Sequence, residues 1–168
     1  MHDTMITIRS TTTQDIPLIL DFIKQLAAYE RLSEEVTATK EDLMQSLFID
    51  RHGEVYFIEK EKIPIGFLII YHNFSSFLGK AGLYLEDVYI QPEYRNRGYG
   101  KHVLSFVAQL AVARGCERVE WSVLNWNEPS IAFYNKLKAI PMDEWTVYRL
   151  KGEALHDLAA KHAKSDRM

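Results

Sequence analysis

Three β-rich runs in the middle of the chain constrain its fold more than any other feature. They cover residues 54–60, 64–74 and 81–91 and are separated by short turns. Neighbouring runs joined in this way pair as antiparallel hairpins. Residues 98–114 then have the pattern of a helix that ends at Gly115, and residues 116–124 have that of another strand. A strand, a helix and a strand in this order form a crossover, so the sequence predicts an α/β protein with a mixed sheet.

The remaining segments place helices and further strands around this sheet. Strands are predicted over residues 5–10 and 144–150, and helices over residues 11–32, 39–49, 127–139 and 152–164. Thr12 and Thr39 each have an aspartate three residues on, which is the spacing of a capping box. The chain has no internal repeat, linker or break in composition. We therefore expect a single domain over residues 1–168, with its core at about 6–150.

Composition excludes several classes of function. The net charge is −3, so the molecule as a whole carries no nucleic-acid footprint. The single cysteine, Cys116, can form no intrachain disulfide, and no stretch approaches the ~18 apolar residues of a membrane span. The N-terminus has no apolar signal core, and the six histidines lack metal-ligand spacing. We therefore expect a cytoplasmic protein without metal and without nucleic-acid or membrane partners.

A cationic turn, RNRGYGK, joins the third β-rich run to the long helix. A helix N-terminus offers unpaired N–H groups and the positive end of the dipole, and glycines let the backbone approach a ligand. Cations there oppose the dipole unless an anion is present, so the turn favours a phosphate or pyrophosphate site over a solvated loop. Its Arg-x-x-Gly-x-Gly pattern is neither a P-loop nor the G-x-G-x-x-G of dinucleotide-binding folds.

This pattern resembles the pyrophosphate-binding turn of the GNAT superfamily of acyl-CoA-dependent acetyltransferases. The segments LAAYE (26–30), LYLEDVYI (83–90) and WNEPSIAFY (126–134) are similar to the spermidine/spermine N-acetyltransferase group, which includes thialysine acetyltransferases. The resemblance covers roughly residues 6–150. It implies the GNAT acyl-CoA N-acyltransferase fold, with a central mixed, mostly antiparallel sheet flanked by helices. It also implies acetyl-CoA as cosubstrate and a homodimer formed partly through the last strands.

The resemblance assigns the cofactor-binding residues. It implies a diphosphate cradle made of Asn96, Arg97, Gly98, Tyr99, Gly100 and Lys101, with Arg95 supporting it. It implies that the pantetheine arm pairs like an added strand with the main chain of Val88, Tyr89 and Ile90. A backbone N–H there would polarise the thioester carbonyl. Asn127 and Ser130 are candidates for contacts to the CoA arm, with helix capping as the alternative role.

Tyr134 is the implied general acid, and it is also counted among the residues that contact the cofactor. Attack on the thioester expels a thiolate, and a phenol of pKa ~10 is nearly matched to a thiol of pKa ~8.5, so it can donate the proton. The residues alone leave the alternative of a packed or surface aromatic on an amphipathic helix. The intact NEPSIAFY segment favours the catalytic role.

The amine pocket is expected from acidic and aromatic residues. Its substrate-binding candidates are Tyr29, Glu30, Glu86, Asp87 and Trp126. A lysine-like ammonium has a pKa of ~10.4, so its proton must be removed before attack, and Glu86 is the catalytic candidate, directly or through water. Adjacent strand residues point to opposite faces, so Glu86 and Asp87 share the pocket only across a β-bulge. Otherwise one of them faces the site and the other pairs with a surface base.

The predicted function is transfer of acetyl from acetyl-CoA to the primary amine of a polyamine, a diamine or a lysine analogue such as thialysine. The alternatives are a protein or peptide N-acetyltransferase and a catalytically silent CoA-binding module. One departure from the family pattern is Lys138, which stands where glycine usually ends the helix. Because a left-handed lysine is strained, we expect the helix to end differently here.

Overall fold

The computed structural model describes residues 6–165. The chain divides into two compact units, the first ending at Leu124 and the second beginning at Asn125. Within the described range, no helix is both long and apolar enough to cross a membrane. The first unit carries the sheet and the cationic turn, and the second carries the helix that contains Tyr134.

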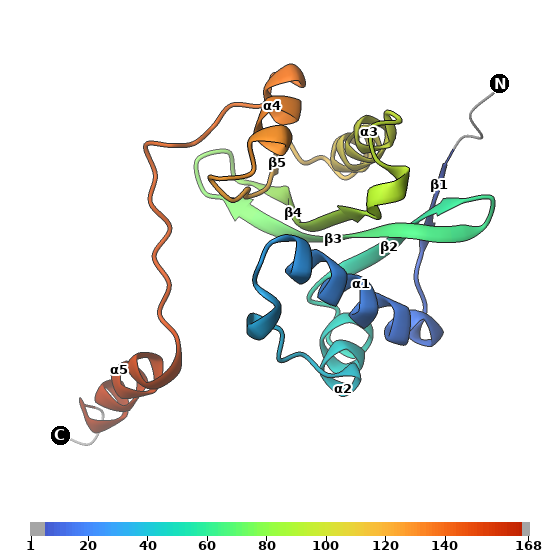
Figure 1. Ribbon diagram of the computed structural model, residues 1–168. Helices are drawn as coiled ribbons and strands as arrows, with labels where there is room; N and C mark the ends of the chain where they lie inside the picture. The colour runs from blue at the N-terminus through green and yellow to red at the C-terminus, as the bar shows by residue number, and fades with distance from the viewer. Residues whose placement is uncertain (1–5, 166–168) are drawn as a thin grey trace. The chain divides into compact units, whose positions relative to one another are not determined.

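A five-stranded sheet in the order β1-β2-β3-β4-β5 forms the centre of the first unit (Figure 1). Its strands are β1 (Thr7–Ser10), β2 (Glu54–Lys60), β3 (Ile63–Ser75), β4 (Lys80–Ile90) and β5 (Val119–Glu120). The first four pair antiparallel, and β5 joins β4 in parallel. The predicted mixed, mostly antiparallel sheet is therefore confirmed. The strand expected over residues 116–124 is much shorter than predicted, because only the two residues of β5 pair with β4.

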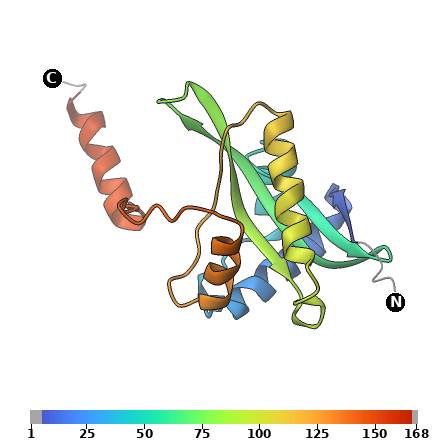
Figure 2. The same cartoon turned by 90° about the horizontal axis from the view of Figure 1, so that it is seen from above.

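Helices cover both faces of this sheet. The helices are α1 (Ile16–Tyr29), α2 (Lys40–Leu43), its continuation as the π-helix η3 (Met44–Ile49), and α3 (Tyr99–Ala113). α1 and α2 lie on one face, and α3 lies along the other (Figures 1 and 2). The two predicted capping boxes are present, one at Thr12 before the 3-10 turn that leads into α1 and one at Thr39 before α2. α3 is followed by Gly115 at φ 72°, the left-handed glycine that the sequence indicates.

The sheet separates two hydrophobic clusters. Along β3, Leu68 and Ile70 pack in the cluster that includes α3, whereas Phe67 and Ile69 pack in the cluster that includes α1. On the α1 side, Phe22 stacks on Phe67 with ring centroids 5.7 Å apart. Successive strand side chains point to opposite faces, which produces this alternation. Because both faces are covered, the middle of β3 is a continuous apolar run rather than an alternating one.

The second unit contains α4 (Glu128–Lys136) and α5 (Gly152–Ser165). The prediction of a strand over residues 144–150 is wrong, because this segment has no regular structure. A β-rich run forms a strand only where another strand takes up its N–H and C=O groups. In the described part of the chain, no strand pairs with this segment.

The end of α4 corrects the expectation for Lys138. Its φ is 62°, so the lysine adopts the left-handed conformation that usually falls to glycine. The N–H of Lys138 donates to the carbonyl of Asn135 at 3.0 Å, and that of Ala139 donates to the carbonyl of Tyr134 at 3.2 Å. These two bonds form a Schellman motif, which satisfies carbonyls that a helix end leaves unpaired. The helix therefore ends as it would with glycine, at the cost of backbone strain in the lysine.

Candidate active site

The turn between β4 and α3 leaves the N-terminus of the helix open. Two of its residues are left-handed, Asn96 at φ 60° and Gly98 at φ 80°. Gly98 is the N-cap, no described side chain caps this end, and the N–H of His102 donates to the carbonyl of Gly98 at 3.3 Å. The N–H groups of the first turn therefore lack acceptors within the helix. A Cβ added at Gly98 would meet nothing within 4 Å, so the turn has room for a ligand.

A hollow of about 310 Å³ lies at this helix end, lined by Gly98, Lys101, His102 and Ser105. Lys101 adds its positive charge to the positive potential at the N-terminus of the helix, so the hollow suits an anion such as a phosphate. The exposed Arg97 of the same turn donates to the carbonyl of Glu93 at 3.4 Å. His102 and Ser105 were missed by the sequence reasoning. The i, i+4 spacing from Lys101 to Ser105 could have indicated a shared helix face.

Arg95 connects this turn to the end of α1. Its Nε donates to the carbonyl of Ile90 at 2.7 Å. Its guanidinium carbon lies 4.5 Å from the ring centroid of Tyr29 and 5.3 Å from that of Tyr89. A guanidinium over an aromatic face is attracted by the ring quadrupole. Arg95 therefore braces the turn against both β4 and α1.

A β-bulge interrupts β4 at Glu86. Asp87 pairs with Ile69 and Leu85 pairs with Ile70, so Glu86 is the extra residue. Leu85 and Val88 both pack in the α3 cluster, which leaves two residues between them instead of one. Asp87 lies on the α1 face because its partner Ile69 packs in the α1 cluster. Of the two alternatives that the sequence left open, the structure has the bulge, and it removes the strict alternation that would separate Glu86 from Asp87.

Three carboxylates interact near this bulge. Burial, and then the negative charges of Glu86 and Glu30, raise the pKa of Asp87 to about 7. Burial also raises the pKa of Glu30, the residue that follows α1. Asp87 and Glu30 are half-buried, whereas Glu86 is exposed. Among the described residues, no cation forms an ion pair with any of the three, so this region attracts a positively charged ligand.

Aromatic residues extend the acidic region along the sheet. The rings of Tyr71 and Tyr84 lie 5.0 Å apart on paired positions of β3 and β4. The hydroxyl of Tyr84 is 2.7 Å from Oγ of Ser122. Burial and the charge of Glu86 raise the pKa of Tyr71. Tyr71 was missed by the sequence reasoning, although its position two residues beyond Ile69 on the same strand face could have indicated it.

β4 has an open edge beyond its short pairing with β5. The parallel pairing ends at Tyr84 and Glu120, whereas β4 continues to Ile90. In the described chain, no strand pairs with this edge over residues 85–90. Its main-chain groups, including those of Val88 and Tyr89, can therefore pair with an extended ligand.

The second unit carries the other predicted site residues. Asn127 is buried and caps α4, its side chain accepting the N–H of Ser130 at 3.4 Å. Tyr134 is half-buried on α4, and its ring centroid lies 5.5 Å from that of Phe133. Trp126 is exposed just before the helix. The predicted capping role of Asn127 is confirmed by this hydrogen bond.

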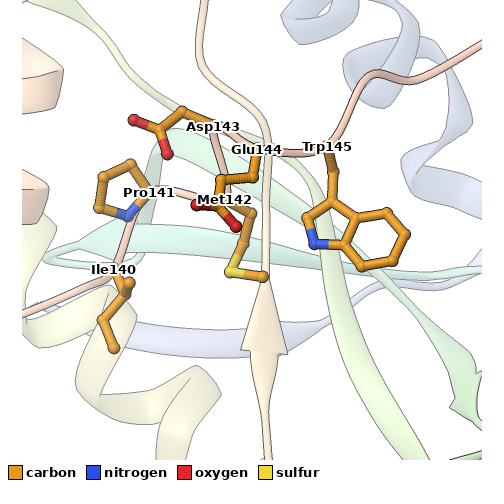
Figure 3. Close-up of a pocket in the computed structure, with 6 residues that line it drawn as sticks. All are labelled: Ile140, Pro141, Met142, Asp143, Glu144 and Trp145. Carbon is orange, nitrogen blue, oxygen red and sulfur yellow. The ribbon is translucent and has the colours of Figure 1, made fainter.

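Another hollow, of about 290 Å³, belongs to a single run of the second unit. It is lined by Ile140, Pro141, Met142, Asp143, Glu144 and Trp145 (Figure 3). The N–H of Trp145 donates to the carbonyl of Met142 at 3.2 Å and closes a turn. The side chains of Asp143 and Trp145 point away from each other (Figure 3). All six residues are exposed and consecutive, so this hollow is a bend in a surface segment.

The sequence profile of the Acetyltransferase (GNAT) family matches residues 20–138. The chain is 34% identical over 170 residues to the thialysine N-epsilon-acetyltransferase of Sus scrofa, covering 92% of this chain and 97% of the relative. It is 31% identical over 194 residues to the L-ornithine N5-acetyltransferase NATA1 of Arabidopsis thaliana, covering 88% and 85%.

Solved structures share the fold. The integron cassette protein VCH_CASS6, from the mobile metagenome of V.cholerae, superposes with a TM-score of 0.76 at 21% identity, covering 92% of this chain and 97% of that one. The aminoglycoside acetyltransferase meta-AAC0020, from an uncultured soil metagenomic sample, gives a TM-score of 0.74 at 20% identity, covering 89% and 99%. At these identities the likeness concerns the fold alone.

Proposed function

The chain belongs to the GNAT family of acetyltransferases and is an acetyl-transfer enzyme, and from this premise we propose that its acceptor is the primary amine of a small cationic molecule. The observation that carries the proposal is the group of three interacting carboxylates around the β4 bulge, Glu30, Glu86 and Asp87. Such a group attracts and orients an ammonium ion. Polyamines, diamines and lysine analogues such as thialysine have this chemistry. The relatives named for thialysine and ornithine support the same class.

The donor in this family is acetyl-CoA, and the open helix end fits its phosphates. The residues that we propose to hold it are Asn96, Arg97, Gly98, Tyr99, Gly100 and Lys101, with Arg95 bracing their turn. A glycine N-cap with no Cβ and an adjacent lysine suit a diphosphate. We propose further contacts to its arm from Val88, Tyr89, Ile90, Asn127 and Ser130. Bound there, acetyl-CoA would supply the thioester whose carbonyl the amine attacks.

Within this site, we assign four roles to side and main chains. Tyr29, Glu30, Asp87 and Trp126 bind the acceptor. A carboxylate of the bulge, with Glu86 as the sequence candidate, takes up the ammonium proton. An N–H of β4 polarises the carbonyl. Tyr134 returns a proton to the leaving sulfur, a role supported by its place in the NEPSIAFY segment.

The experiment is release of CoA thiol from acetyl-CoA over a panel of acceptors: spermidine, spermine, thialysine, lysine, a diamine, an aminoglycoside and a peptide. Wild type, Tyr134→Phe and the control Tyr148→Phe are compared, since Tyr148 is an exposed tyrosine of the same unit. We expect release with a small cationic amine, a loss of roughly 10²-fold in Tyr134→Phe and little change in Tyr148→Phe. Release with peptide alone would instead support a protein N-acetyltransferase. Tight acetyl-CoA binding without release on any acceptor would support a catalytically silent CoA-binding module.

We also propose that the chain works as a cytoplasmic homodimer whose two units form one domain. Exposed apolar side chains between α4 and α5 support the dimer, including Ile140, Trp145 and Val147. Light scattering after gel filtration should give twice the chain mass of 19.5 kDa. Val147→Asp should shift it toward the monomer, whereas Val112→Asp, at an exposed valine of α3, should not. A monomeric wild type would contradict the proposal.

A further inference from the structure

Two neighbouring carboxylates compete for the role of proton acceptor at the bulge. The amine must lose a proton before it can attack, since a lysine-like ammonium with a pKa of ~10.4 is almost fully charged at neutral pH. The bulge brings both Glu86 and Asp87 out of strict alternation, so position along β4 alone does not choose between them. The two residues differ in burial and in the charges around them, and these differences indicate which one accepts the proton more readily.

Burial separates the two residues. Glu86 is the extra residue of the bulge and is exposed, whereas Asp87 is paired with Ile69 and half-buried. An ion pair that forms in a partly dry position loses hydration on both partners. Proton transfer from the ammonium to Asp87 converts that pair into a neutral amine and a neutral acid. Burial therefore favours the transfer at Asp87.

Each element packed around Asp87 leaves its carboxylate without a positive partner. On β4 the neighbour is Glu86, and at the end of α1 it is Glu30, both of which repel a negative charge on Asp87. On β3 the paired Ile69 is apolar, and Tyr71 lies beyond it. The Arg95 guanidinium lies over the rings of Tyr29 and Tyr89 instead. In the described chain the Asp87 carboxylate therefore has no cationic partner, and it can pair with a cation that comes from outside the protein.

We propose that Asp87, rather than Glu86, accepts the proton of the substrate ammonium, an inference that rests on the proposed acetylation of a small cationic amine. In this step one N–H bond of the ammonium breaks and its electron pair stays on nitrogen as the lone pair. An O–H bond forms at a carboxylate oxygen of Asp87. The acid later passes this proton to solvent water and returns to its charged form. Glu86 and Glu30 act as positioning residues, since their charges draw the ammonium in and raise the proton affinity of Asp87.

The test is the pH profile of kcat/KM for the amine, measured on the full-length enzyme for wild type, Asp87→Asn, Glu86→Gln and Glu30→Gln. The wild type should lose activity as pH falls below about 7, where Asp87 becomes protonated before substrate binds. Asp87→Asn should lose this acid limb and roughly 10²-fold in rate. Glu86→Gln and Glu30→Gln should keep the limb but move it to lower pH, because each removes a negative charge near Asp87.

A weakly basic acceptor distinguishes a proton acceptor from a binding residue. A diamine fluorinated beside its amine is largely neutral at assay pH and needs little help to lose a proton. The deficit of Asp87→Asn should shrink at least about tenfold with this acceptor if Asp87 takes the proton. An equal deficit with both acceptors would overturn the proposal. Unchanged acetyl-CoA binding by calorimetry shows that Asp87→Asn is folded.

The outcomes separate this inference from the proposed function. A wild type active on small amines, with an acid limb that survives in Asp87→Asn and disappears in Glu86→Gln, would overturn the inference alone and assign the proton to Glu86. A wild type that transfers acetyl to no small amine would overturn both. An acid limb that is lost only in Asp87→Asn, together with a smaller deficit of this variant on the weakly basic acceptor, would support both.

Discussion

The guanidinium of Arg114, directly after α3, donates two hydrogen bonds to the carboxylate of Glu54 at the start of β2, at 2.6 and 2.8 Å. The hydroxyl of Tyr56 donates to the same carboxylate at 2.8 Å. Arg114 holds the pKa of Glu54 below its usual range. A carboxylate whose pKa falls on folding adds stability above its unfolded pKa, ~4.3 for glutamate, and this stability is lost as pH falls through the folded value. The pair therefore links α3 to the sheet in a pH-dependent way.

Replacing Arg114 by lysine keeps the charge and removes the two-pronged contact. We expect Arg114→Lys to lower the free energy of unfolding by about 1 kcal/mol at pH 7, a small value because water screens both partly exposed groups. The loss should shrink when Glu54 is protonated. Urea unfolding at neutral and at strongly acidic pH measures the loss with Glu54 charged and with Glu54 protonated. Arg149→Lys, at an exposed arginine, is the control. A deficit of equal size at both pH values would contradict the assigned pairing.

Replacement by alanine should destabilise the protein to very different extents at two glycines. A Cβ at Gly66 would lie 2.1 Å from the carbonyl oxygen of Tyr89, a backbone atom, so Gly66→Ala should cost about 3 kcal/mol or prevent folding. A Cβ at Gly98 meets nothing, so Gly98→Ala should cost only about 1 kcal/mol for its left-handed φ of 80°. Thermal unfolding compares the two. Equal losses would mean that the close approach between β3 and β4 relaxes without cost.

The left-handed Lys138 offers a stabilising substitution. Lys138→Gly removes the strain at φ 62° and keeps the Schellman hydrogen bonds, so we expect a gain of about 1 kcal/mol. Lys136→Gly, in the last turn of α4, should have the opposite sign, since glycine is a poor helix former. Calorimetric unfolding resolves the two shifts. A loss in both variants would show that Lys138 makes a stabilising contact that outweighs its strain.

Arg95 and Arg97 occupy the same turn but should have separable roles. Arg95→Lys loses the Nε bond to Ile90 and the stacking on Tyr29, so we expect the acceptor KM to rise several-fold. Arg97→Lys loses one long hydrogen bond and should leave the acceptor KM near wild type. Initial rates with each substrate varied in turn measure both constants. An acceptor KM unchanged in Arg95→Lys would remove Arg95 from the acceptor side.

Local signals predicted much of the fold. The bounds of β2 agree with the predicted residues 54–60, and the capping boxes at Thr12 and Thr39 are where their spacing put them. The bulge was one of two alternatives, since two adjacent acids could share a face in no regular strand. Each of these features depends on residues within a few positions of one another, so a single sequence contains the information.

Features that depend on distant partners could not be predicted. The β-rich residues 144–150 read as a strand, but strand formation requires a neighbour that no local pattern supplies. The interaction of Glu30 with Asp87, and the raised pKa of Asp87, require that α1 end over β4. The placement of Arg95 between two rings likewise depends on residues 66 positions apart in the sequence, since Tyr29 comes from α1.

The position of Arg95 places one side chain in contact with both the turn proposed for the donor and the end of α1. One end of this side chain's network is the turn proposed for the donor, and the other is Tyr29, which precedes Glu30 on the acceptor side. A change in this turn that moved the Arg95 guanidinium would also alter its contact with Tyr29 at the end of α1. Linkage then requires that whatever factor the donor applies to acceptor affinity, the acceptor applies equally to donor affinity.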